Sequence, residues 1–131
     1  AWVDSRSRAL LEESYRVAAF ETNLEGRCTW SNRTYMDWTG LTANQIKSIG
    51  WRQAVCPDYR DQVNEEWENA VEERRSFDYL FSVYDHENDE TRWVRCVAYV
   101  ARDKDGMPLG WIGLMRQVSE NRVRSFHGDV D

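Results

Sequence analysis

The chain contains three cysteines and two histidines, residue types whose side chains often perform chemistry or bind metals in proteins. Cys28, Cys56 and Cys96 are far apart in the sequence, with no CxxC pair and no Cys/His pairing, so they predict neither a zinc site nor a disulfide framework. This pattern is typical of reduced thiols, and we expect a cytoplasmic location. His86 and His127 stand alone, the first in an expected loop and the second in a polar tail. The sequence therefore predicts no metal site.

The sequence contains no motif of an enzyme. It has no Gly-rich phosphate loop and no Ser elbow, and most Asp and Glu residues fall in expected turns or on exposed helix faces. We therefore predict no catalytic residue and no enzyme activity for this chain itself. The net charge of −6 argues against nucleic acid as a partner. No apolar run reaches membrane-spanning length and no signal peptide is recognisable, so we expect no membrane partner.

Aromatic residues are abundant, with seven Trp, six Tyr and four Phe in 131 residues. Trp38, Trp51, Trp67 and Trp111 could close an aromatic box around a cation, or the same rings could fill the core. We favour filling, because so many large rings consume much of the interior of a small domain.

A predicted β-hairpin organises the chain. Residues 91–101 are rich in Val, Trp and Tyr and contain no Gly or Pro, and residues 108–118 have a similar character. Asp105 followed by Gly106 separates the two runs, which is a strong hairpin signal. Alternate side chains of a strand point to opposite faces, and here both faces carry apolar residues. We therefore expect the hairpin to lie inside a larger sheet.

The periodicity and capping signals predict the other elements. In chain order they are a helix at 4–17, strands at 18–22 and 28–31, a short helix capped by Ser31 or Asn32 and ending at Gly40, a helix opened by the capping box of Thr42 and Gln45, a short helical piece at 51–55, a long helix opened by Pro57, and a strand at 77–83. Cys56 stands immediately before Pro57, and we interpret it as the cap of the long helix.

The order of these elements resembles a PAS domain with its C-terminal PAC motif. The residues that carry the resemblance are Leu24, Glu25 and Gly26; Ser31, Asn32 and Tyr35; Thr39, Gly40 and Leu41; Cys56, Pro57, Asp58, Tyr59 and Arg60; Arg92, Trp93 and Val94; Arg102, Asp103, Lys104, Asp105 and Gly106; and Gly110, Trp111, Ile112 and Gly113. Together they assign residues 17–119 to the PAS/PAC domain. Residues 1–16 then form an N-terminal flanking helix, and residues 120–131 begin a linker to an output domain.

The resemblance implies an α+β fold, with a five-stranded antiparallel sheet in the order 2-1-5-4-3 and helices across one face. Family members often hold a small ligand between sheet and helices. The candidate ligand-binding residues at this place are Phe20, Trp38, Trp51, Trp67, Tyr79, Phe81, Val94, Cys96, Trp111 and Met115. No inward Arg, Lys or Asp that would bind a carboxylate or an amine is evident.

The resemblance also brings flavin and haem into consideration, and the residues disfavour both. The light-oxygen-voltage branch uses a reactive Cys where this chain has Arg52 and Gln53. It also uses Asn and Gln on late strands where this chain has Val94 and Met115, and a buried flavin edge without partners is costly. Haem sensors of the family commonly ligate iron through a His on the long helix, and residues 58–75 contain none. The cofactor stays unknown.

The resemblance implies a signalling role within a longer protein. We expect a sensory input domain of a multidomain regulator, foremost a sensor histidine kinase, that responds to a small ligand or mediates dimerisation. The alternatives are an input domain of a diguanylate cyclase or phosphodiesterase, and a purely structural dimerisation module without ligand. We expect a homodimer whose interface contains Leu10, Leu11 and Tyr15 of the flanking helix and Trp93, Val97, Tyr99, Ile112 and Leu114 of the outward sheet face.

Overall fold

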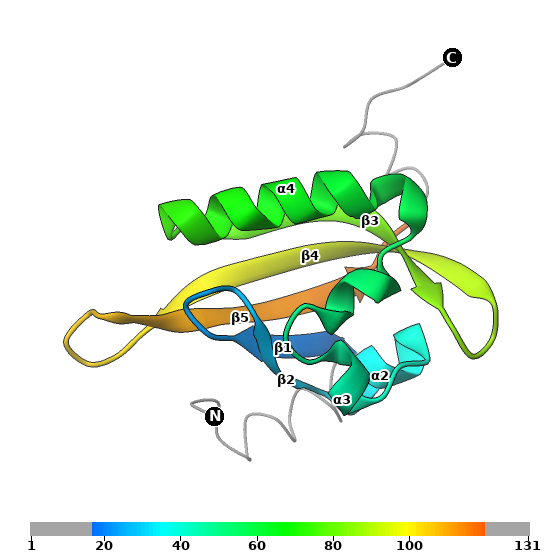
Figure 1. Ribbon diagram of the computed structural model, residues 1–131, viewed down its shortest axis with the longest axis horizontal. Coiled ribbons are helices and arrows are strands. Elements are labelled where there is room, and N and C mark those ends of the chain that lie inside the picture. The colour runs from blue at the N-terminus through cyan, green and yellow to red at the C-terminus, as the bar shows by residue number, and fades with distance from the viewer. Residues whose placement is uncertain (1–16, 120–131) are drawn as a thin grey trace.

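The computed structural model describes residues 17–119, which form a five-stranded antiparallel sheet in the order β2-β1-β5-β4-β3. The strands are β1 (Ala18–Thr22), β2 (Cys28–Ser31), β3 (Phe77–Asp85), β4 (Glu90–Arg102) and β5 (Pro108–Gln117). Four helices lie between β2 and β3 in the chain, namely α2 (Arg33–Thr39), α3 (Ala43–Ile46), the 3₁₀ helix η1 (Gly50–Ala54) and α4 (Pro57–Glu73) (Figure 1). The predicted fold class and strand order are confirmed.

Two predicted segments, the flanking helix at 1–16 and the linker at 120–131, lie outside the described residues. Within residues 17–119, none of the helices has the length and apolar character needed to cross a membrane.

The β4–β5 hairpin contributes the two longest neighbouring strands of the sheet, and its loop is longer than the predicted turn. The loop consists of the three residues 104–106, because the Asp103 N–H donates to the Met107 carbonyl at 2.9 Å and closes it. The Asp103 carboxylate accepts the N–H groups of Asp105 at 2.8 Å and Met107 at 3.0 Å. Gly106 adopts a positive φ of 82°, the conformation that a three-residue hairpin loop requires of its last residue.

Helix α2 is joined to the middle of the sheet by the side chain of Asn32. Its amide oxygen accepts the N–H groups of Tyr35 and Ala19 at 3.0 Å each, and its amide nitrogen donates to the Val17 carbonyl at 3.0 Å. Asn32, and not Ser31, is therefore the cap of this helix. Because the residue is fully buried, these bonds have no competition from water.

The predicted starts of α3 and α4 are also present. The Thr42 side chain accepts the Gln45 N–H at 3.2 Å, and the Gln45 side chain accepts the Thr42 N–H at 2.9 Å, so the capping box forms as predicted. Pro57 occupies the first turn of α4, where its missing N–H costs no hydrogen bond.

Cys56 occupies the N-cap position of α4, as predicted, but it does not act through its side chain. Cys56 precedes α4, but its side chain makes no hydrogen bond to the helix. The Cys56 N–H donates to the Ser82 carbonyl at 2.9 Å, and the neighbouring Val55 forms a β-bridge with Val83. This pairing along the free edge of β3 turns the thiol toward Ser82, whose Oγ lies 3.1 Å from Sγ. Cys56 therefore attaches the start of α4 to the sheet edge.

The core lies between the sheet and the helices. It contains the inward residues predicted from strand alternation, among them Val94, Cys96, Ala98, Trp111 and Met115 of the hairpin and Phe81 and Val83 of β3. Phe20 and Tyr79 pack against this core and are half-buried. Ala18 begins β1 and belongs to the core, as predicted, whereas Val17, the last residue of the helix predicted for residues 4–17, is not helical.

We predict that Asn32→Ala lowers the free energy of unfolding by roughly 2–4 kcal/mol, because it removes a helix cap and leaves buried backbone groups of β1 without partners. The matched control is Thr42→Ala, which removes the exposed cap of α3 and should cost only about 0.5–1 kcal/mol. Urea denaturation of both variants measures the difference. Equal losses would contradict the role assigned to Asn32.

Candidate functional site

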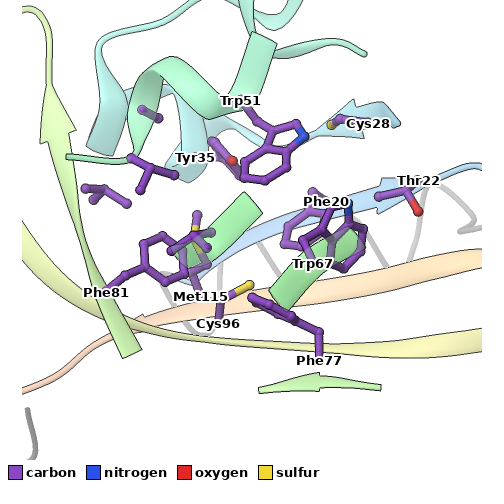
Figure 2. Close-up of a pocket in the computed structure, with 14 residues that line it drawn as sticks. Phe20, Thr22, Cys28, Tyr35, Trp51, Trp67, Phe77, Phe81, Cys96 and Met115 are labelled. Carbon is purple, nitrogen blue, oxygen red and sulfur yellow. The ribbon is translucent and has the colours of Figure 1, made fainter. Parts of the chain in front are cut away.

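A small cavity of about 30 Å³ lies between the sheet and the helices. Strands β1–β5 and helices α2, η1 and α4 all contribute to its wall. The lining residues are Phe20, Thr22, Cys28, Tyr35, Trp51, Ala54, Val55, Val63, Trp67, Phe77, Phe81, Val83, Cys96 and Met115 (Figure 2). The cavity is therefore enclosed by side chains from the whole described domain, almost all of them apolar.

Several of the predicted ligand-binding residues line this cavity. They are Phe20, Trp51, Trp67, Phe81, Cys96 and Met115. Trp38, Tyr79, Val94 and Trp111 do not. The Trp38 ring lies under the Arg92 guanidinium, whose carbon is 5.4 Å from the ring centroid. Val94 is fully buried in β4 but does not line the cavity. The Tyr79 hydroxyl donates to the exposed Gln62 side chain at 3.4 Å and so lies outside the cavity.

Trp111 is fully buried beside the cavity without lining it. Its indole N–H donates to the Arg75 carbonyl, just beyond the end of α4, at 2.9 Å. The four tryptophans considered for a cation box therefore do not surround one space. Trp51 and Trp111 each meet Trp67 edge-on, with centroids 6.3 Å and 5.6 Å from it. This arrangement supports the interpretation that the rings fill the core.

The lining residues that the sequence analysis missed come from both the strands and the helices. Eight lining residues were assigned to a predicted strand or helix but not to the cavity, namely Thr22, Cys28, Tyr35, Ala54, Val55, Val63, Phe77 and Val83. One signal for Tyr35 was available, since Tyr35 and Thr39 are four residues apart and both are buried on α2. No sequence signal distinguishes a residue that lines a gap from one that fills it.

Polar groups in the cavity wall are few and uncharged. The Thr22 hydroxyl donates to the Asn23 carbonyl at 2.9 Å and accepts the Trp111 N–H at 3.2 Å, so it is occupied. Burial raises the pKa of the Cys28 thiol to about 11, and burial also raises the pKa of Cys96. Burial raises the pKa of the Tyr35 hydroxyl well above its usual value. At neutral pH the wall therefore carries no charge.

These residues do not fit flavin or haem. A flavin ring presents several polar edge atoms, whereas the inward positions expected to meet them hold Val83, Val94 and Met115, all buried and apolar. Cys56 and His86, two described residues able to ligate haem iron, do not line the cavity. Instead, the Cys56 thiol lies 3.1 Å from Ser82 Oγ and the His86 ring contacts the Gln53 carbonyl at 2.8 Å. Over residues 17–119, no group of three or more His, Cys, Asp or Glu side chains could hold a metal ion.

The opposite face of the sheet carries the residues predicted for a dimer interface. Val97, Ile112 and Leu114 are half-buried, and Tyr99 is 63% exposed. Trp93 is partly covered by its own chain, since the Tyr59 ring of α4 meets it edge-on with centroids 5.1 Å apart. Leu10, Leu11 and Tyr15 lie outside the described residues.

A groove of about 500 Å³ runs along this outer face. It is lined by Arg95, Val97, Tyr99, Leu114, Arg116, Gln117, Val118 and Ser119. Arg95 pairs with both carboxylate oxygens of Asp78, at 2.9 Å and 2.5 Å, which lowers the Asp78 pKa. Arg116 lies opposite Arg95 in the β4–β5 register and has no ion-pair partner among the described residues.

Comparison with known proteins places this geometry in a family. The family model described as "PAS fold" matches residues 27–115. A curated relative, the uncharacterised protein y4lL of Sinorhizobium fredii, is 26% identical over 119 residues, which are 91% of this chain. The chain spans only 14% of the length of that relative.

Two solved structures show the same fold. The N-terminal domain of a diguanylate cyclase with PAS/PAC sensor from Marinobacter aquaeolei matches with a TM-score of 0.67 and 18% identity, over 81% of this chain and 98% of that one. A sensory box histidine kinase/response regulator from Burkholderia thailandensis matches with a TM-score of 0.61 and 14% identity, over 92% of this chain and 90% of that one. At such identities the likeness concerns the fold.

We predict that only Cys56 reacts rapidly with a thiol-specific disulfide reagent at pH 8. Cys56 is half-buried, whereas Cys28 and Cys96 are buried and their raised pKa values keep them protonated, and the thiolate is the reactive form. The release of coloured product should show one fast thiol in the folded protein and three after unfolding. In Cys56→Ser the fast phase should vanish, and its persistence would contradict the assigned burial.

Proposed function

Because the chain belongs to the PAS fold family, we propose that it is the sensory input domain of a larger multidomain regulator, with a sensor histidine kinase as the parent. The names of the Burkholderia and Marinobacter proteins support a kinase or a cyclase as the output, and the small share of the Sinorhizobium relative that the chain spans supports a long parent. Three free cysteines suit a reducing compartment, so we assign the domain to the cytoplasm.

The observation that carries this proposal is the pairing of an inner cavity with an apolar outer face on the same strands. Cys96 and Met115 line the cavity, and their neighbours Val97 and Leu114 line the outer groove. An input domain needs one surface that receives a signal and another that passes it on. Strands β4 and β5 present both, on opposite faces of one sheet.

We propose that the outer face forms a two-fold homodimer with the N-terminal segment of the partner. The segment contains Leu10 and Leu11 followed by Glu12 and Glu13. Its leucines suit the apolar floor of the groove, and its glutamates are complementary in charge to Arg116. A closed two-fold pair is also the commonest arrangement of protein oligomers.

A second candidate function is a purely structural dimerisation module. The small size of the cavity favours it, since about 30 Å³ leaves little room for a ligand unless the wall moves. The two functions differ in whether the cavity selects a ligand. The structural module requires a dimer, so the oligomeric state is the first property to measure.

We predict that Tyr99→Glu combined with Leu11→Glu converts a dimer into a monomer while the core stays folded, because two charges are placed in an apolar interface. Light scattering across the micromolar range measures the mass, and circular dichroism checks the fold. The control is Met107→Glu, which adds the same charge at a residue that is 61% exposed in the hairpin loop, and which should remain dimeric. A monomeric original chain over this range would refute the dimer.

A further inference from the structure

The Tyr35 hydroxyl is a polar group left without a partner in the wall of the cavity. Tyr35 is only 5% exposed, and its hydroxyl makes no hydrogen bond to any described residue. Tyr35 is one of the residues that line the cavity, and Figure 2 labels it among them. Buried tyrosine hydroxyls usually find a partner, so an unpaired one marks a place where a partner is missing.

From this group we propose that the cavity binds a small neutral molecule with an apolar body and one hydrogen-bonding group, which the Tyr35 hydroxyl holds. The inference rests on the proposed sensory function and specifies its ligand class. Packing alone does not require the hydroxyl, because the Tyr35 ring already meets Phe20 edge-on at 6.0 Å and a phenylalanine would keep that contact. The hydroxyl therefore has a use only if something in the cavity bonds to it.

The wall specifies a neutral and mainly apolar ligand. None of the lining side chains is acidic or basic, and the Thr22 hydroxyl is already bonded on both sides. The thiols of Cys28 and Cys96 are protonated and bonded weakly at most. A charged ligand would lose its hydration without a compensating partner. Among the described lining residues, Tyr35 thus supplies the one hydroxyl that is not already hydrogen-bonded.

The cavity must widen to admit a ring. Its volume of about 30 Å³ holds only one or two non-hydrogen atoms, whereas a cavity that accepts benzene is about 150 Å³. Most lining residues are buried, but Trp51 of η1 and Phe20 are half-buried. Trp51 stands on a short 3₁₀ helix and its ring meets Trp67 only by an edge. Outward movement of the Trp51 indole is therefore the easiest route to a larger cavity.

The test is a titration of the full chain with three probes of similar size, followed by amide chemical shifts in the NMR spectrum. Phenol has a ring and a hydroxyl, toluene has the ring without the hydroxyl, and benzoate carries a charge. We expect phenol to shift the amides of cavity residues and to bind about five- to tenfold more tightly than toluene, as one hydrogen bond allows. Benzoate should not bind there.

Matched variants assign the preference to one hydroxyl. Tyr35→Phe should abolish the preference for phenol over toluene, whereas Tyr79→Phe, which removes a hydroxyl bonded to Gln62 outside the cavity, should preserve it. Trp51→Ala should strengthen phenol binding at least tenfold and keep the preference, which provides a second test if Tyr35→Phe does not fold.

Three results would overturn the inference. They are the absence of cavity shifts with phenol, equal binding of phenol and toluene to the original protein, and an unchanged preference in Tyr35→Phe. The dimer is measured separately by light scattering, so a failure of the ligand assignment and a failure of the proposed oligomeric input domain are distinguishable.

Discussion

The packing of the Trp67 indole holds the described domain together. The ring meets Phe20, Trp51, Phe77 and Trp111 edge-on, with centroids between 5.3 Å and 6.5 Å, so one side chain of α4 contacts β1, η1, β3 and β5. Its N–H donates to the Gly26 carbonyl at 3.0 Å, which adds the β1–β2 turn. A Cβ at Gly26 would lie 2.9 Å from the indole nitrogen, so only glycine permits this approach. Edge-to-face contacts of this kind stabilise beyond the area that they bury.

The cavity follows from the way this aromatic cluster meets the helical wall. Rigid rings that meet edge-on leave gaps at their corners, which flexible aliphatic side chains would fill. Helix α2 is held in place, because the buried Asn32 side chain caps its first turn at Tyr35 and makes two hydrogen bonds to Val17 and Ala19 at the start of β1. The start of α4 is likewise attached to the edge of β3 through the backbone of Cys56. The cavity is therefore enclosed by elements whose ends are held in place.

The sequence predicted the elements well because their signals are local. Capping residues, the position of Pro57 and the alternation of the strands each depend on a few neighbouring residues, and all of them appear in the structure. The site was predicted only in part, because whether a side chain lines the cavity depends on where it ends within the core, and strand or helix periodicity does not specify this. Trp51 and Trp38 are similar in sequence terms, yet the first lines the cavity and the second lies under Arg92. Cys56 shows the same limit, since its position was predicted, but the pairing that turns its thiol toward Ser82 involves residues 26 positions apart.

The alternation of β4 and β5 links the two faces on which the proposals depend. Cys96 pairs with Met115, and the next pair, Val97 with Leu114, points the opposite way. Side chains of the first pair line the cavity, and those of the second line the outer groove. A group bound in the cavity at Met115 and a group bound in the groove at Leu114 would therefore contact adjacent residues of the same strand. The two faces are thus joined through the backbone of β4 and β5 alone, without intermediate side chains.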